Sequence, residues 1–241
     1  MARGLIRSQK ETEKRKERSV AFGPIMKVRV GELDIELAPP TKESMEEFVK
    51  PGLQQASITR YLSRQTAPVL EDELEWFDKV RADKTRLNWG IWVVKGDERI
   101  LIGDTALIDI QRKHIHQATS GSLIFNTQYW RKGIASSIHK ARTWYAFQHM
   151  GLHRIMSAVI QGNEGSRKAL EKSGYRLVYV ERNEQFVDGE LRHMDNLAVL
   201  NPLPVFWDQW WHGDEPDDEA IEARVVTEEI MAWAKDNVEL L

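Results

Sequence analysis

The stretch from Tyr129 to Ser136 constrains the fold most, because it joins a predicted strand to a predicted helix through a single glycine. The apolar run Ser122–Phe125 before it is typical of a short strand. After Gly133, apolar residues recur at helical spacing, at Ile134, Ile138, Ala141 and Tyr145. Free backbone N–H groups and the positive end of the helix dipole favour an anion at such a helix N-terminus. We therefore expect residues 131–136 to form a phosphate-binding turn.

Two better-known phosphate motifs are excluded by the same residues. Lys132 precedes Gly133, and no Gly-Lys-Ser or Gly-Lys-Thr follows, so the turn is not a P-loop. It contains one glycine rather than three, so it is not a dinucleotide-binding fingerprint.

The segment Trp130–Ala135 resembles the coenzyme A pyrophosphate loop of the GNAT acetyltransferase superfamily, written Gln/Arg-x-x-Gly-x-Gly/Ala. Trp130 stands where many members have Gln or Arg, and the pair Tyr129-Trp130 resembles the branch of ribosomal-protein N-terminal acetyltransferases. The resemblance continues through Gly151–Ile155 and Asn163–Tyr175 and covers roughly residues 26–200. Three motifs in the right order are a much stronger indication than one.

This resemblance implies acetyl-coenzyme A as cosubstrate and no metal. The pyrophosphate is then expected to bind backbone N–H groups of Arg131, Lys132, Gly133, Ile134, Ala135 and Ser136. The pantetheine arm is expected to pair with the backbone of Ile124 and Phe125 like an added strand. Asn163 and Arg167 complete the predicted cofactor-binding set.

The catalytic residue implied by the resemblance is Ser166, three residues after Asn163. Many superfamily members have a tyrosine seven residues after this asparagine, but the position here is Leu170, which cannot donate a proton. Ser166 is therefore expected to protonate the departing thiolate, directly or through water. The alternative is an early-helix serine that satisfies a backbone group.

The group that deprotonates the amine stays open. Many relatives use a glutamate on the strand before the loop, but Ala118–Ser122 contains no carboxylate. The candidates are Asp104, His116, Glu164 and Asp195. A water chain to bulk solvent is an equally good alternative, because the amine needs only a positioned relay.

The order of predicted elements gives an α/β (α+β) fold. It runs strand, two helices, three strands, helix, strand, helix and a final hairpin around Asp188-Gly189. This order matches the acetyltransferase fold: a mixed, mostly antiparallel sheet, flanked by helices, whose two central parallel strands splay apart. We expect this domain to span residues 26–200.

Segments of different composition flank the predicted domain. Residues 1–25 form a charged arm that either binds RNA or a ribosomal surface or stays solvated, and its mixed signs favour the solvated state. Residues 201–241 form a Trp-rich, acidic extension with a predicted helix. The extension either packs on its own domain or forms an oligomer interface. Because Trp207, Trp210 and Trp211 cannot all stay exposed, we expect the extension to dock on one of these two surfaces. The resemblance favours a homodimer, since many members of the family pair and the extension is long for a simple lid.

Composition excludes several classes of protein. The chain has no cysteine, which excludes disulfides, thiolate metal sites and a cysteine nucleophile. The net charge of −3 gives no field that favours nucleic acid, and no apolar run is long enough for a membrane. The alternation His114-x-His116 lacks a nearby carboxylate or cysteine, so we expect no metal there. A cytoplasmic location is the default expectation.

Two classes of function remain. The first is an N-acetyltransferase that moves an acetyl group from acetyl-coenzyme A to a primary amine, either a protein N-terminus or a small molecule. The second is a non-catalytic acyl-coenzyme A-binding or scaffold protein that binds a partner through its tail. The intact loop favours the first class, and the absent tyrosine and glutamate keep the second open.

Overall fold

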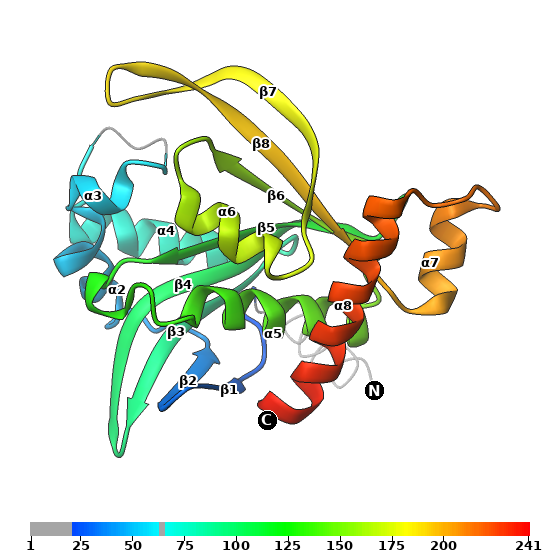
Figure 1. The fold of residues 1–241 in the computed structure, drawn as a ribbon. Coiled ribbons are helices and arrows are strands. Elements are labelled where there is room, and N and C mark those ends of the chain that lie inside the picture. The colour runs from blue at the N-terminus through cyan, green and yellow to red at the C-terminus, as the bar shows by residue number, and fades with distance from the viewer. Residues whose placement is uncertain (1–20, 63–65) are drawn as a thin grey trace, which may run out of the picture.

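The computed structural model describes residues 21–62 and 66–241, and its centre is one nine-stranded sheet in the order β7-β8-β6-β5-β4-β3-β2-β1-β9 (Figure 1). The strands are β1 (Met26–Val30), β2 (Leu33–Ala38), β3 (Leu87–Lys95), β4 (Glu98–Gln111), β5 (Gln117–Ile124), β6 (Arg154–Ile160), β7 (Arg176–Val187), β8 (Glu190–Leu200) and β9 (Val238–Leu240). Every neighbouring pair is antiparallel except β5 and β6, which are parallel. The predicted mixed, mostly antiparallel sheet is confirmed.

Helices cover both faces of this sheet. They are α2 (Met45–Glu47), the π-helical η1 (Phe48–Leu53), α3 (Ala56–Thr59), α4 (Leu70–Ala82), the 3₁₀ turn η2 (Thr127–Tyr129), α5 (Ile134–Gln148), α6 (Glu164–Glu171), α7 (Pro204–Trp211) and α8 (Asp218–Asn237). Helices α5 and α8 lie on one face, and the segment from α2 to α4 lies on the other (Figure 1).

The two faces have separate apolar cores. Ile91 and Ile138 belong to the larger core, which lies between the sheet and helices α5 and α8. Trp92, Phe48 and Phe125 belong to the smaller core under α2 and α4. Because successive strand residues point to opposite faces, β3 supplies both cores and is apolar almost throughout.

Two turns follow directly from the sequence. The first predicted strand, residues 27–37, proves to be the hairpin of β1 and β2, with Gly31 at φ +60° in the turn. The hairpin of β7 and β8 turns at Asp188 and Gly189, which both have positive φ, as the Asp-Gly pair predicts.

The chain before β1 is only partly described. The charged run from Arg3 to Arg18 lies outside the described residues, so its two alternatives stay open. Residues 21–25, counted with the arm in the sequence analysis, lie against β3. The Gly23 N–H donates to the Asn88 carbonyl at 3.1 Å, and Ala21 is buried.

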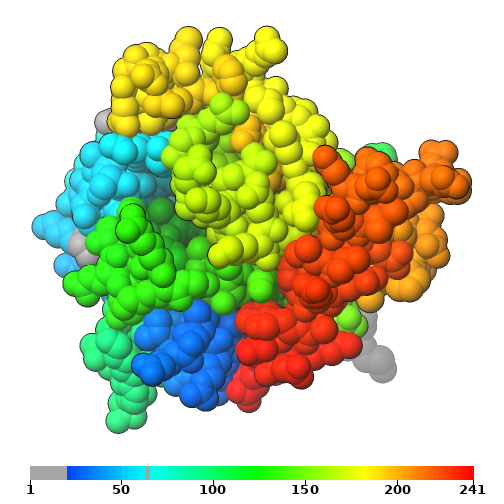
Figure 2. All heavy atoms as spheres, in the orientation of Figure 1, coloured from blue at the N-terminus to red at the C-terminus, as the bar shows by residue number. Residues whose placement is uncertain are grey.

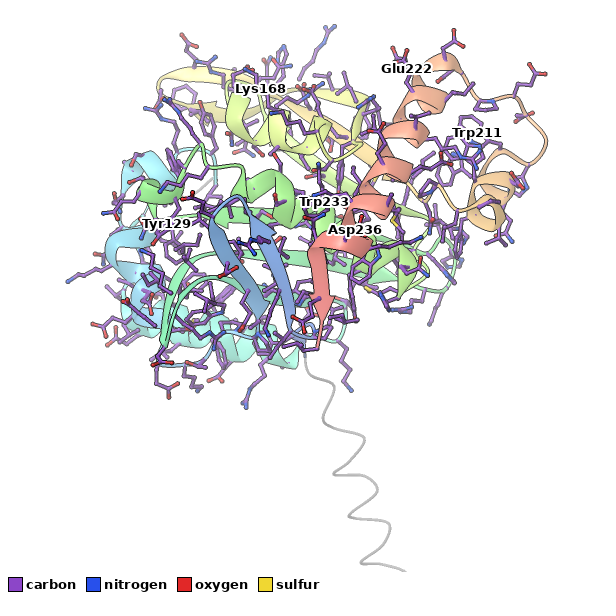
Figure 3. All side chains as sticks on the ribbon, turned by 60° about the horizontal axis from the view of Figure 1, so that its bottom comes forward. Tyr129, Lys168, Trp211, Glu222, Trp233 and Asp236 are labelled. Atoms are coloured by element: carbon purple, nitrogen blue, oxygen red, sulfur yellow. The ribbon has the colours of Figure 1, made fainter. Side chains whose placement is uncertain are left out.

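The C-terminal segment packs on its own domain. Met231 and Ala234 of α8 belong to the larger core, and β9 extends the sheet by pairing with β1. Figure 3 shows Trp233 on α8, where the Lys140 ammonium of α5 lies 5.3 Å from its ring. Because α8 and β9 pack on their own domain, this packing gives no support for a dimer, and the homodimer stays a prediction. Even the 20-residue α8 is not apolar enough to cross a membrane, and neither is any other described helix.

Candidate functional site

The parallel strands β5 and β6 separate after three residue pairs. Pairing runs from Gln117 with Arg154 to Thr119 with Met156 and then stops. Beyond that point β5 stays bonded to β4 as far as Ile124, and β6 stays bonded to β8 as far as Ile160. The Ser157 hydroxyl donates to the Ser120 carbonyl at 3.3 Å, which marks the apex of the gap. This is the splay that the sequence resemblance implied.

The open end of the gap faces a recess. Figure 2 shows it as a hollow between the cyan segment around α3, the green loop before α5 and the yellow-green α6. Tyr61 closes part of it, because its hydroxyl donates to the Gly162 carbonyl at 3.0 Å. Arg60 forms an ion pair with Asp188 at 3.1 Å, which joins the flap from α2 to α4 to the tip of the β7–β8 hairpin. The flap therefore overhangs the gap.

The predicted phosphate turn has the geometry of an anion site. Gly133 precedes α5 in a left-handed conformation, with φ of 79° and ψ of −2°. The first-turn N–H groups of α5, as at any helix start, have no helical partners. Arg131 also has positive φ, at 60°, and its side chain and that of Lys132 are exposed beside the turn. The Lys132 ammonium lies 5.2 Å from the ring of Tyr129, labelled in Figure 3.

Of the two residues predicted to pair with the pantetheine arm, Ile124 has its backbone N–H directed away from β4. The Phe125 N–H donates to the Ile102 carbonyl at 2.9 Å, so this N–H points toward β4, and the Phe125 side chain is buried. Ile124 alternates with Phe125, so its backbone faces the gap. Its carbonyl accepts a hydrogen bond from the Trp130 indole at 2.7 Å. That bond ties the phosphate turn to the strand that leads into the gap.

Gly103 permits this arrangement of β4 and β5. A Cβ atom there would lie 2.1 Å from the Leu123 carbonyl oxygen, so no larger residue fits without movement of the backbone.

Helix α6 begins at Asn163, as predicted. The Asn163 side chain accepts a hydrogen bond from the Ser166 N–H at 3.3 Å, which is the N-cap geometry. Ser166 shares a helix face with Leu170 and Ser173, at i+4 and i+7. Leu170 is buried, and the Ser173 hydroxyl lies 3.4 Å from the Ser136 carbonyl in the first turn of α5. Ser166 thus lies on the side of α6 that faces α5.

The Arg167 side chain, also predicted to bind the cofactor, points to another side of α6 and contacts β8. Its guanidinium donates to Glu171 at 2.7 Å and to Asp195 of β8 at 2.5 Å. These groups line a pocket of about 570 Å³ between α6 and β8. The reason is helical geometry, since one residue after Ser166 the side chain points about 100° further round α6. Arg167 thus links α6 to β8.

Three of the four candidate bases, all except Asp104, lie away from the apex of the gap. His116 lies at the closed end of the strand pair, with its ring 5.2 Å from that of His153. Asp195 is held by Arg167 and by Gln161. Glu164 is exposed in the first turn of α6. None of these three lies at the apex of the gap.

Glu47 on the flap is a candidate that sequence reasoning missed. Its carboxylate accepts a hydrogen bond from the Leu101 N–H at 3.1 Å, beside the β4 residue that binds the end of β5. Burial raises the pKa of the Glu47 carboxyl, and the bond from Leu101 opposes that change. Glu47 has no distinguishing signal in the sequence, because it stands in a charged run with Glu43 and Glu46.

A buried arginine lies behind β5, also unrecognised from the sequence. Arg142 of α5 is fully buried and donates to the Gly121 carbonyl at 2.8 Å and to the Ser122 hydroxyl at 2.9 Å. Burial lowers the pKa of the Arg142 guanidinium, while Tyr175 and Asp104 act to raise it. Asp104, one of the candidate bases, therefore belongs to the surroundings of Arg142.

His139 accepts from the same guanidinium. Its Nδ1 atom lies 2.6 Å from an Arg142 nitrogen, and arginine can only donate. Burial, followed by the charge of Arg142, holds the pKa of His139 well below its ordinary value of 6.5. The ring is therefore neutral, with its proton on Nε2.

No metal centre is formed by the part of the chain that the structure describes. No group of three or more His, Asp or Glu side chains in residues 21–62 and 66–241 is arranged to hold an ion.

Comparison with known proteins agrees with this geometry. Residues 34–176, more than half of the chain, match the family model described as an acetyltransferase (GNAT) domain. The Bacillus subtilis (strain 168) protein named "Uncharacterized N-acetyltransferase YoaA" is 26% identical over 148 residues, which are 60% of this chain and 81% of that protein.

Two solved structures share the fold. A spermidine N-acetyltransferase from Vibrio cholerae, in complex with CoA and spermine, has a TM-score of 0.62 and 19% identity, over 69% of this chain and 95% of its own. Mycobacterium smegmatis RimJ, in complex with CoA-disulfide, has a TM-score of 0.66 and 17% identity, over 91% of this chain and 97% of its own.

Proposed function

We propose, from the premise that this chain belongs to the GNAT acetyltransferase family, that it transfers an acetyl group from acetyl-coenzyme A to a primary amine bound under the flap. The observation that carries the proposal is the gap between β5 and β6, which opens toward the left-handed turn at Gly133. The turn supplies N–H groups for the pyrophosphate, and the gap supplies a strand edge for the pantetheine arm.

The reaction needs few groups from the protein. The nitrogen lone pair of a neutral amine attacks the thioester carbonyl carbon, and the carbonyl π electrons move onto the oxygen. The intermediate then collapses with loss of the thiolate. The backbone N–H of Ile124, which alternates with the bonded N–H of Phe125, faces the arm. Arg131 and Lys132 add positive charge beside the pyrophosphate.

Ser166 is the proposed donor to the departing thiolate. Its place on the α5-facing side of α6, next to the N-cap Asn163, supports this role. Leu170 has no polar atom in its side chain and is buried, so it cannot replace Ser166.

Glu47 is the proposed acceptor of the amine proton, directly or through water. A carboxylate with a raised pKa is a stronger base than an ordinary glutamate, and Glu47 lies on the flap side of the sheet. Asp104 acts instead on the buried Arg142, whose pKa its charge helps to raise.

The acceptor is proposed to be either a peptide α-amine or a small polyamine. The sequence resembles the ribosomal-protein N-terminal acetyltransferase branch, and one structural neighbour was crystallised with spermine. The test measures thiol release from acetyl-coenzyme A with a panel of peptides, polyamines, amino acids and aminoglycosides.

The proposal expects one class of amine to raise thiol release well above hydrolysis, with an acetylated product in the mass spectrum. Acetyl-coenzyme A binding without acetylation of any amine in the panel would instead support the non-catalytic alternative.

A further inference from the structure

A buried polar cluster surrounds Arg142, directly behind the open part of β5. Arg142 and Thr105 are fully buried, yet both contact Ser122, which is exposed at the gap. One Arg142 nitrogen donates to Thr105 Oγ1, to the Gly121 carbonyl and to Ser122 Oγ, at 2.5, 2.8 and 2.9 Å. Its Nε atom is buried with no hydrogen-bond partner among the described residues. Burial of a charged group costs free energy, so we expect this guanidinium to have a function beyond packing.

One arrangement of these hydrogen bonds leaves a proton for the gap. The Thr105 and Ser122 hydroxyl oxygens lie 2.6 Å apart on opposite strands, either can be the donor, and each accepts from Arg142. The Thr105 hydroxyl has a second acceptor in the Gly121 carbonyl at 3.2 Å, but the Ser122 oxygen is the nearer of the two. Each hydroxyl has one hydrogen to donate. When Thr105 donates to Ser122, the Ser122 hydrogen is free to point at an acceptor in the gap. Donation from the guanidinium polarises that hydroxyl and strengthens it as a donor.

The place of Ser122 along β5 fits the reacting end of the cosubstrate. In the proposed function, a pantetheine arm that begins at the phosphate turn would run back along β5, past Ile124 and toward the apex at Ser120. The thioester, at the far end of the arm, would then lie closer to the apex than the pyrophosphate. Ser122 is the exposed hydroxyl of β5 between Ile124 and the apex.

We propose that Ser122 is a catalytic residue that donates a hydrogen bond to the thioester oxygen, and that Arg142 is the positioning residue that polarises it. This inference rests on the proposed acetyl transfer. As the amine nitrogen bonds to the carbonyl carbon, the carbonyl π electrons move to oxygen, and the Ser122 hydrogen bond strengthens. When the carbon–sulfur bond breaks, the electrons return and the thiolate leaves. Ser122 keeps its proton throughout.

Three variants test the role of Ser122 with the amine found in the panel. Ser122→Ala should lower kcat by about 10²-fold, as loss of one oxyanion donor does. The KM for acetyl-coenzyme A should stay near that of wild type. Ser122→Thr keeps the hydroxyl and should recover most of the lost kcat. Thr119→Val is the matched control, since it removes a hydroxyl from β5 where β5 and β6 are still paired. Its kcat should equal that of wild type.

A second measurement needs no acceptor amine. The infrared band of the isotope-labelled thioester carbonyl should lie at a lower frequency in the wild-type complex than in the Ser122→Ala complex. Calorimetry should give both proteins the same affinity for acetyl-coenzyme A. An unchanged carbonyl band in Ser122→Ala overturns the inference, and so does an unchanged kcat. A wild-type protein that acetylates no amine refutes the proposed function, while the carbonyl band still decides the contact with Ser122.

Discussion

Replacement of His139 by Asn should remove a defined part of the pH dependence of folding stability. The folded protein keeps His139 neutral, because the ring is 5% exposed and lies against the Arg142 guanidinium. The unfolded chain exposes the same ring to water, where it titrates near its ordinary value of 6.5. Below that pH only the unfolded state gains the proton, so stability falls as the pH falls. Above it both states are neutral and the contribution is constant.

The size of the effect follows from this linkage. For a folded pKa far below the ordinary value, His139 should cost about 1.4 kcal/mol of stability between roughly pH 7.5 and roughly pH 5.5. His153 adds to the wild-type slope, because burial and the neighbouring His116 also lower its pKa. Both proteins contain His153, so its contribution cancels when the unfolding free energy of His139→Asn is subtracted from that of wild type. Asparagine keeps an oxygen near the position of Nδ1 for Arg142.

Urea unfolding of both proteins across this pH range is the assay. His139→Asn should be less stable at neutral pH, because it leaves a cavity, but its stability should fall less steeply on acidification. His114→Asn, at an exposed position, is the matched control and should follow the wild-type profile. Parallel profiles for wild type and His139→Asn would show that burial and the charge of Arg142 do not hold His139 neutral in the folded protein, and the account of the buried cluster would be wrong.

Three further changes test other parts of the structure. Gly133→Val should weaken acetyl-coenzyme A binding in calorimetry by at least about tenfold, since one hydrogen bond to a charged group is worth about 1.5–3 kcal/mol; an unchanged affinity would place the pyrophosphate elsewhere. Ser166→Ala should lower kcat with little change in cofactor affinity, and a wild-type kcat across the pH range would remove Ser166 from the mechanism. Met231→Ala should cost about 2–5 kcal/mol of unfolding free energy. That loss should not depend on protein concentration, whereas a concentration-dependent loss would show that α8 packs on a second subunit.

The sequence predicted the sheet and the strand–turn–helix well, because both depend on local signals. Gly133 and the Asp188-Gly189 pair occupy backbone conformations that favour glycine, and such positions are visible in a sequence. Asn163 is the N-cap that its residue type predicts. These elements needed no knowledge of distant contacts.

The parts that the sequence left open depend on contacts between distant residues. Arg142 and Ser122 are 20 positions apart in sequence, and helical periodicity alone gives no reason to bury an arginine. Glu47 gains its raised pKa only because the flap folds over β4. The contact of Arg167 with Asp195 joins α6 to a later strand and has no local sequence signal. The packing of the C-terminal segment was also not predictable, because the sequence of its acidic helix does not indicate that β9 pairs with β1.

The crystal structure of the protein with coenzyme A tests the central claim most directly. The account predicts that the pyrophosphate contacts the N–H groups of residues 131–136 and that the pantetheine arm lies between β5 and β6. The sulfur should then lie near Ser122 on one side and Ser166 on the other. A cofactor bound in the charged groove of about 660 Å³ between β1, β2 and the end of α8, with the gap empty, would contradict it.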